Sequence, residues 1–210
     1  MDRTQAHTIV RAVSIVVVLA AIVAQAAELA ANNAFNATRF FAFFTIQSNL
    51  IGVAAFAWLI ATRDRPRSRA LEVLRGAAVV YLTVTFFVVI FLLSGIDVQL
   101  QLVWVDVALH KFFPIVVVLD WVLDPPAMRL SARDALLWLA YPLAWTGLTM
   151  VRGAVDGWYP YPFLDPANGG YGQVLLTAVA ITVAFFVIAL ATIGVANALG
   201  QRRSPALPAT

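Results

Sequence analysis

The sequence contains no cysteine and only two histidines among its 210 residues. Without cysteine the chain forms no disulfide, thiolate nucleophile, iron–sulfur cluster or cysteine-linked lipid anchor. His7 lies near the N-terminus, far along the chain from His110, so the pair is not expected to ligate a haem. Neither an HExxH spacing nor a phosphate-binding glycine loop is present. The sequence therefore predicts no metal site and no cofactor.

Charged residues are also scarce, at 12% of the chain, whereas 62% of its residues are hydrophobic. A helix needs about 20 apolar residues to cross a bilayer, and six stretches of the sequence meet this requirement. They lie at about 9–28, 40–61, 76–96, 100–123, 133–152 and 172–198. We therefore expect residues 1–210 to form one all-α domain, a polytopic bundle of six transmembrane helices, because the short loops leave no room for a second domain.

The basic residues indicate how this bundle is oriented. All of them except Arg39, Arg152 and Lys111 fall on one side of the predicted bundle: Arg3, Arg11, Arg63, Arg65, Arg67, Arg69, Arg75, Arg129, Arg133, Arg202 and Arg203. By the positive-inside rule this side is cytoplasmic, so both termini are expected in the cytoplasm of a bacterial inner membrane. The charge is distributed by loop and forms no basic face for nucleic acid. Alternatively, the first apolar stretch is a secretory signal peptide, and Ala24-Gln25-Ala26 is its cleavage site.

Two loops have distinctive composition. The inner loop at 62–75 contains Ala70, Leu71, Val73 and Leu74, which favour a short interfacial helix. The outer loop at 153–172 contains Trp158-Tyr159-Pro160-Tyr161-Pro162-Phe163-Leu164-Asp165-Pro166, and its prolines favour an extended segment. This aromatic segment is either an interfacial belt or a lid over the outer mouth of the bundle.

Polar residues within the apolar stretches need a partner or a function, because burying them in hydrocarbon is costly. Thr45, Ser48 and Asn49 share one face of the second predicted helix. Asp106 and His110, four residues apart, stack on one face of the fourth. Both groups are expected in the outer half or middle of the bundle, where they can meet. Lys111 is expected to pair with an acid, either Asp106 or Glu28.

This arrangement is compatible with nucleophilic catalysis. Thr45 would be the nucleophile, His110 the general base and then acid, and Asp106 the group that orients His110. Backbone N–H groups inside a helix are already bonded, so an oxyanion site would need side-chain donors. Asn49 is the first candidate, and Ser48, Tyr159 and Tyr161 are further candidates for binding substrate or oxyanion.

Structural roles are equally compatible with the same residues. Thr45 can bond back to the carbonyl of Phe41, one turn earlier in a continuous helix. Ser48 and Asn49 can join neighbouring helices, and His110 can make a structural hydrogen bond.

Three motifs together resemble the bacterial six-helix relatives of the androgen-induced gene 1 protein and the androgen-dependent TFPI-regulating protein. They are Phe43-Phe44-Thr45-Ile46-Gln47-Ser48-Asn49-Leu50, Leu109-His110 with Pro114 and Asp120-Trp121, and the segment from Trp158 to Phe163. The animal members of this family are intramembrane threonine hydrolases that cleave fatty acid esters of hydroxy fatty acids. The resemblance implies that Thr45 is the nucleophile and His110 its partner.

The leading hypothesis is therefore an intramembrane hydrolase of lipid esters, whose partner is a lipid substrate from the bilayer. A proton-linked transporter or channel is an alternative, with Asp106, His110, Lys111 and Asp120 as a relay. However, the sequence has neither an internal repeat nor a matched pair of interrupted helices. A non-catalytic membrane scaffold is the third hypothesis. The sequence does not indicate an oligomeric state.

Overall fold

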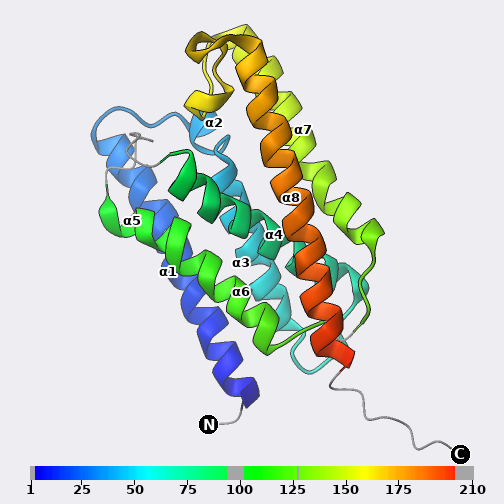
Figure 1. The fold of residues 1–210 in the computed structure, drawn as a ribbon. Coiled ribbons are helices and arrows are strands. Elements are labelled where there is room, and N and C mark those ends of the chain that lie inside the picture. The colour runs from blue at the N-terminus through cyan, green and yellow to red at the C-terminus, as the bar shows by residue number, and fades with distance from the viewer. Residues whose placement is uncertain (1–2, 94–101, 127, 202–210) are drawn as a thin grey trace, which may run out of the picture.

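The computed structural model describes residues 3–93, 102–126 and 128–201 (Figure 1). All regular elements within these ranges are helical, which confirms the predicted all-α class. Their order is α1 (Arg3–Ala31), α2 (Ala37–Phe40), α3 (Phe44–Ala61), α4 (Arg69–Phe91), α5 (Val103–Val107), η1 (Ala108–Phe112), α6 (Phe113–Leu123), α7 (Ala132–Asp156), η2 (Pro162–Leu164), η3 (Pro166–Asn168) and α8 (Gly170–Gln201).

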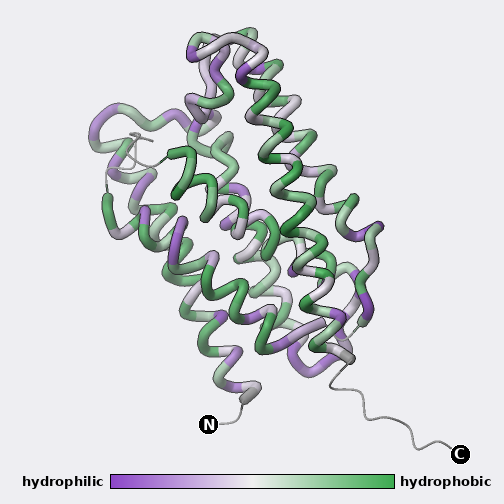
Figure 2. The backbone as a smooth tube through the Cα atoms, in the orientation of Figure 1, coloured by the Kyte–Doolittle hydropathy of each residue, from purple (hydrophilic) through white to green (hydrophobic). Residues whose placement is uncertain are grey.

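Four of the described helices are long and apolar enough to cross a membrane, namely α1, α3, α4 and α8. Only 17% of the most apolar window of α8 is buried inside the protein, so most of that helix presents apolar side chains outward. Figure 2 shows hydrophobic colour along the helices and hydrophilic segments mainly at the two ends of the bundle. An apolar exterior of this kind is typical of a protein that lies in a bilayer.

The predicted boundaries differ from the observed ones in three places. The second predicted helix, 40–61, is interrupted at 41–43, between α2 and α3. The fourth contains a π-helical segment, η1, which separates α5 from α6. The short interfacial helix expected near 70–74 is instead the beginning of α4, whose N-cap Ser68 accepts a hydrogen bond from Leu71 N–H. Residues 94–96 and 100–101 of the predicted helices lie outside the described residues, as do Arg202 and Arg203.

Helix α4 is the central element of the bundle. It packs against α3, α6, α7, α8 and η1. Two glycines permit the closest contacts between the helices: a Cβ at Gly76 would lie 2.0 Å from the ring of Trp138 in α7, and one at Gly52 in α3 would lie 2.6 Å from the ring of Phe113 in α6. The Gly52 contact holds α3, which carries Thr45, against α6, which directly follows the segment η1 that contains His110.

An ionic network lies at the end of the bundle where α1 begins. Asp120 of α6 accepts hydrogen bonds from Arg11 Nε (2.8 Å) and Arg75 Nη2 (3.0 Å). Arg75 also donates to Glu72 (2.7 Å), and the next carboxylate, Asp124, accepts from Arg11 (2.5 Å) and Arg67. Several arginines that the sequence identifies only as markers of orientation thus join α1, α4 and α6.

Candidate active site

The interruption between α2 and α3 places Thr45 in the first turn of a new helix. The carbonyl groups left unpaired by the interruption accept side-chain donors: Phe41 O accepts from Gln47 Nε2 (2.7 Å), and Ala42 O accepts from Trp145 Nε1 (2.9 Å). The N-cap residue Phe43 has no side chain that could cap the helix. Thr45 is therefore not in the middle of a helix, and the predicted bond from its hydroxyl to Phe41 is not formed.

Pro114, the second residue of α6, accounts for the π-helical segment before that helix. Pro114 has no N–H, and in a regular helix its ring would collide with the carbonyl of His110. The chain widens instead, and Phe113 N–H bonds to Ala108 O, five residues back. A π turn brings residues five apart onto one face. Accordingly, Asp106 Oδ1 lies 2.8 Å from His110 Nδ1, while Asp106 Oδ2 lies 2.9 Å from Lys111 Nζ.

Thr45, His110 and Asp106 form a continuous row of hydrogen bonds. The Nε2 atom of His110 lies 3.2 Å from Thr45 Oγ1, and both residues are buried. Because Asp106 can only accept at its carboxylate, the proton of His110 belongs on Nδ1, which leaves Nε2 free to accept the Thr45 proton. Lys111 pairs with Asp106, one of its two predicted partners.

The side-chain amide of Asn49 binds the backbone of both α3 and η1. Its Nδ2 donates to two backbone carbonyls, Thr45 O (2.8 Å) and Leu109 O (3.2 Å), so neither hydrogen is available for an oxyanion. Leu109 O needs this donor because its π-helical partner would be the nitrogen of Pro114. Asn49 thus holds η1 against α3 and sets His110 beside Thr45.

Ser48 joins two helices beside the candidate site. Its Oγ donates to Thr45 O (3.1 Å) and lies 3.4 Å from Thr85 Oγ1 of α4, so it helps to join α3 to α4. These contacts fit the structural alternative for Ser48.

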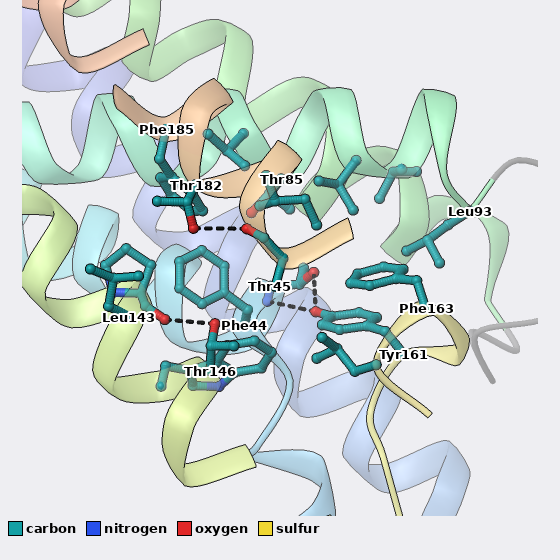
Figure 3. Close-up of a pocket in the computed structure, with 18 of the residues that line it drawn as sticks. Phe44, Thr45, Thr85, Leu93, Leu143, Thr146, Tyr161, Phe163, Thr182 and Phe185 are labelled. Carbon is teal, nitrogen blue, oxygen red and sulfur yellow. Dashed lines mark hydrogen bonds between the residues drawn. The ribbon is translucent and has the colours of Figure 1, made fainter. Parts of the chain in front are cut away.

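Tyr161 reaches Thr45, as Figure 3 shows. Its hydroxyl oxygen accepts from Thr45 N–H (3.3 Å) and lies 3.4 Å from Thr45 Oγ1. Burial raises the pKa of this phenol, although hydrogen bonds to Thr45 and to the backbone of Phe44 oppose the effect. The phenol stays protonated at neutral pH and can donate. The other tyrosine candidate, Tyr159, packs against Gly153 of α7 instead.

The loop that carries Tyr161 is folded against the bundle. The predicted extended conformation is correct at Tyr161, but two short 3-10 turns follow at η2 and η3. Phe43 makes edge-on contacts with the rings of Trp158 and Tyr161 at centroid distances of 5.8 and 5.7 Å. The guanidinium groups of Arg39 and Arg152 both lie over Trp158.

An apolar cavity of about 60 Å³ is lined by Thr45 but not by His110. Its walls come from α3, α4, α7, α8 and the segment at η2 (Figure 3). These walls are mainly aliphatic and aromatic, and they include three residues that the sequence alone does not single out: Val88, Leu143 and Phe185. They come from three helices, α4, α7 and α8, and only the folded chain brings them together.

Two further predictions concern ion binding and proton transfer. Asp120 does not join Asp106 and His110 in a relay, because its contacts are with Arg11, Arg75 and His7 at the end of the bundle where α1 begins. Among the described residues, no group of three or more histidine, aspartate or glutamate side chains is placed to hold a metal ion.

Comparison with known proteins identifies no relative. No family model, curated protein or solved structure matches the chain.

Proposed function

We propose that this protein is an intramembrane hydrolase of lipid esters that uses Thr45 as its nucleophile. One observation carries the proposal: Asp106, His110 and Thr45 are hydrogen-bonded in sequence, with Thr45 at the edge of an apolar cavity. A hydroxyl, an imidazole and an orienting carboxylate in this order are the requirements for nucleophilic ester cleavage.

The geometry supports a two-stage reaction. His110 Nε2 removes the proton of Thr45 as Oγ1 attacks the ester carbonyl, and Asp106 stabilises the imidazolium. When the C–O bond of the ester breaks, His110 gives this proton to the departing alcohol, which leaves an acyl group on Thr45. Water then attacks the acyl carbon while His110 removes its proton. When the bond between the acyl carbon and Thr45 Oγ1 breaks, His110 returns this proton to Oγ1, and the fatty acid and free Thr45 are released.

The beginning of α3 supplies donors for the oxyanion. Thr45 N–H belongs to the first turn, where backbone N–H groups lack partners within the helix and the helix dipole favours negative charge. The Tyr161 hydroxyl now occupies the position to which this N–H points. In the proposed reaction the carbonyl oxygen of the ester takes that position, and Tyr161 shifts to donate to it.

The proposal includes the six-span topology, with the composite α5–η1–α6 and α7 crossing the membrane beside α1, α3, α4 and α8. The beginning of α1 and the end of α8 lie at the same end of the bundle, which supports termini on one side (Figure 1). The arginines at that end support its assignment to the cytoplasm of a bacterial inner membrane. The candidate site then faces the outer leaflet, from which substrate would be admitted.

The choice of substrate class rests on the family resemblance and on the cavity. The motifs around Thr45, His110 and Trp158 resemble those of threonine hydrolases that cleave fatty acid esters of hydroxy fatty acids. An apolar cavity that ends at the nucleophile is the environment an acyl chain requires.

Labelling with a fluorophosphonate tests the proposed nucleophile. The probe should modify Thr45 of the wild-type protein, and the modified residue is mapped by peptide mass spectrometry. Thr45→Ala and His110→Ala should each abolish labelling and hydrolysis of a fatty acyl ester. Thr182→Ala is the matched control, because Thr182 lines the same cavity but its hydroxyl bonds to Ala178 O. This variant should retain both the labelling of Thr45 and the hydrolysis of the ester. Labelling of another residue, or full turnover by folded Thr45→Ala, would refute the assignment.

A further inference from the structure

A second cavity lies at the end of the bundle where α1 begins. Its volume is about 190 Å³, and it is formed by the first turns of α1, the end of α3, the segment 63–67 and the end of α6. Basic side chains dominate its wall: His7, Arg11, Arg63, Arg65 and Arg67 line it together with one carboxylate, Asp124.

Asp124 neutralises only part of this charge. Burial alone would raise the pKa of Asp124, but hydrogen bonds from Arg11 and Arg67 outweigh burial and lower the pKa to about 2. The carboxylate is therefore ionised at neutral pH and holds the two guanidinium groups in fixed positions.

Two arginines of the cavity remain without a buried counter-charge. Arg63 pairs only with Asp64 (3.3 Å), and both side chains are largely exposed, so water screens the pair. Arg65 has no ion pair among the residues that the structure describes. The mouth of the cavity thus presents two exposed guanidinium groups, one unpaired and one in a solvent-screened pair, in front of a fixed ionic network. Planar guanidinium groups bind phosphate oxygens with paired hydrogen bonds.

The position of the cavity indicates where its ligand comes from. It lies at the ends of α1 and α3, two of the helices able to cross a membrane, and thus at the level of the lipid phosphates. Leu123, which also lines the cavity, is half exposed on the outer surface of α6, where an acyl chain can lie. Basic pockets between transmembrane helices at this level are suited to anionic headgroups.

We propose that this cavity is a binding site for the phosphate group of an anionic phospholipid. Arg63 and Arg65 contact the phosphate directly, and the ion pairs of Arg11 and Arg67 with Asp124 form a fixed wall behind it. The site is separate from Thr45 and does not depend on the proposed hydrolase activity.

The test uses the full chain, purified in detergent and depleted of lipid. Its unfolding temperature is measured against increasing phosphatidylglycerol or phosphatidylcholine in the micelles, and in a parallel experiment against inorganic phosphate. The double variant Arg63→Gln/Arg65→Gln removes the two exposed guanidinium groups at the mouth of the cavity. Arg129→Gln/Arg133→Gln is the matched control, because it removes two exposed arginines from the same end of the bundle outside the cavity.

We expect phosphatidylglycerol to stabilise the wild type and the control variant at lower concentration than phosphatidylcholine does. The cavity variant should bind phosphatidylglycerol about tenfold more weakly or worse. Inorganic phosphate could instead stabilise the wild type but not the cavity variant, while the two lipids act equally. This result would uphold the phosphate site and identify its ligand as a soluble phosphate. Equal loss in the two double variants, or no stabilisation by either probe, would overturn the proposal.

Discussion

At the scale of single residues, Asp106 is the residue with two competing roles. Its two oxygens bind different partners, Oδ1 to His110 and Oδ2 to Lys111. Lys111 is half exposed, so its pair with Asp106 contributes little to stability. The contact with buried His110 is the one expected to matter for chemistry, because it fixes the tautomer that can accept the Thr45 proton.

Asp106→Asn is therefore expected to lower turnover of a fatty acyl ester by about 10²- to 10⁴-fold while leaving the unfolding temperature close to that of the wild type. An asparagine can keep the shape of the site, but it neither stabilises the imidazolium nor enforces the tautomer. Both quantities are measured on one preparation. Lys111→Gln serves as the control and should keep turnover within a few-fold. A large drop in unfolding temperature of Asp106→Asn with nearly normal turnover would identify Asp106 as a structural partner of Lys111.

The residues of this hydrogen-bonded row could be predicted from the sequence, but the backbone N–H of Thr45 that we propose as an oxyanion donor could not. The spacing of Asp106 and His110 places them on one helix face, and an isolated polar residue such as Thr45 stands out in an apolar stretch. The backbone donor at Thr45 was missed because the apolar run Phe41-Ala42-Phe43 contains no proline or glycine to mark a helix start. The interruption there depends on Trp145, which is 103 residues away in the chain and binds the carbonyl of Ala42.

At the scale of elements, the π segment η1 and helix α3 act as one unit joined by Asn49. Pro114 was a usable signal for the irregular helix, because a proline inside an apolar helix must widen or bend it. The partner that completes the irregular segment was not predictable, because Asn49 lies 60 residues from Leu109 and sequence spacing relates only neighbours within a helix.

Asn49→Leu should lower the free energy of unfolding by about 1–3 kcal/mol, because Leu109 O is then buried without a donor. Turnover should fall with it, since η1 is no longer held where His110 meets Thr45. Chemical denaturation measures the free energy of unfolding, and an ester hydrolysis assay measures turnover. Ser48→Ala is the control: it removes a contact between α3 and α4 but leaves η1 in place, so it should lose stability while retaining turnover. Unchanged turnover in Asn49→Leu would contradict a positioning role for Asn49.

At the scale of the whole molecule, the ionic network joins three helices at the end opposite the candidate active site. Its acid sensitivity follows from Asp124. The pKa of this group is lowered to about 2, below its ordinary value of 3.8, so its contribution to stability is complete above about pH 4 and is lost as the pH falls towards 2.

Asp124→Asn should therefore be less stable than the wild type at pH 7, and the difference should shrink between pH 4 and pH 2. Thermal unfolding in detergent over this pH range measures it. Asp64→Asn is the matched control, because Asp64 pairs with Arg63 at the surface and its loss should have little effect at any pH. A stability difference that is independent of pH would show that Asp124 acts through packing and not through its charge.

The proposed topology concerns the whole molecule as well, and the absence of cysteine makes it simple to test. A single cysteine at Arg129 and another at Ala167, both exposed positions, should react with a membrane-impermeant maleimide from opposite sides of the membrane. Ala167→Cys should be labelled in intact spheroplasts, and Arg129→Cys only after the membrane is opened. Labelling of both from the same side would refute the six-span arrangement.

The cavity beside Thr45 is small, and this has a kinetic consequence. Ligand pockets usually hold several hundred cubic ångströms, whereas this cavity measures about 60 Å³, and Tyr161, Phe163 and Leu164 of the outer loop form part of its wall. In the proposed hydrolase we expect a long acyl chain to enter only when the segment 158–164 moves outward. In a hydrolase of this design, esters of different intrinsic reactivity would approach one common maximal rate. That rate would be the frequency with which this segment moves outward, not the rate of the bond cleavage beneath it.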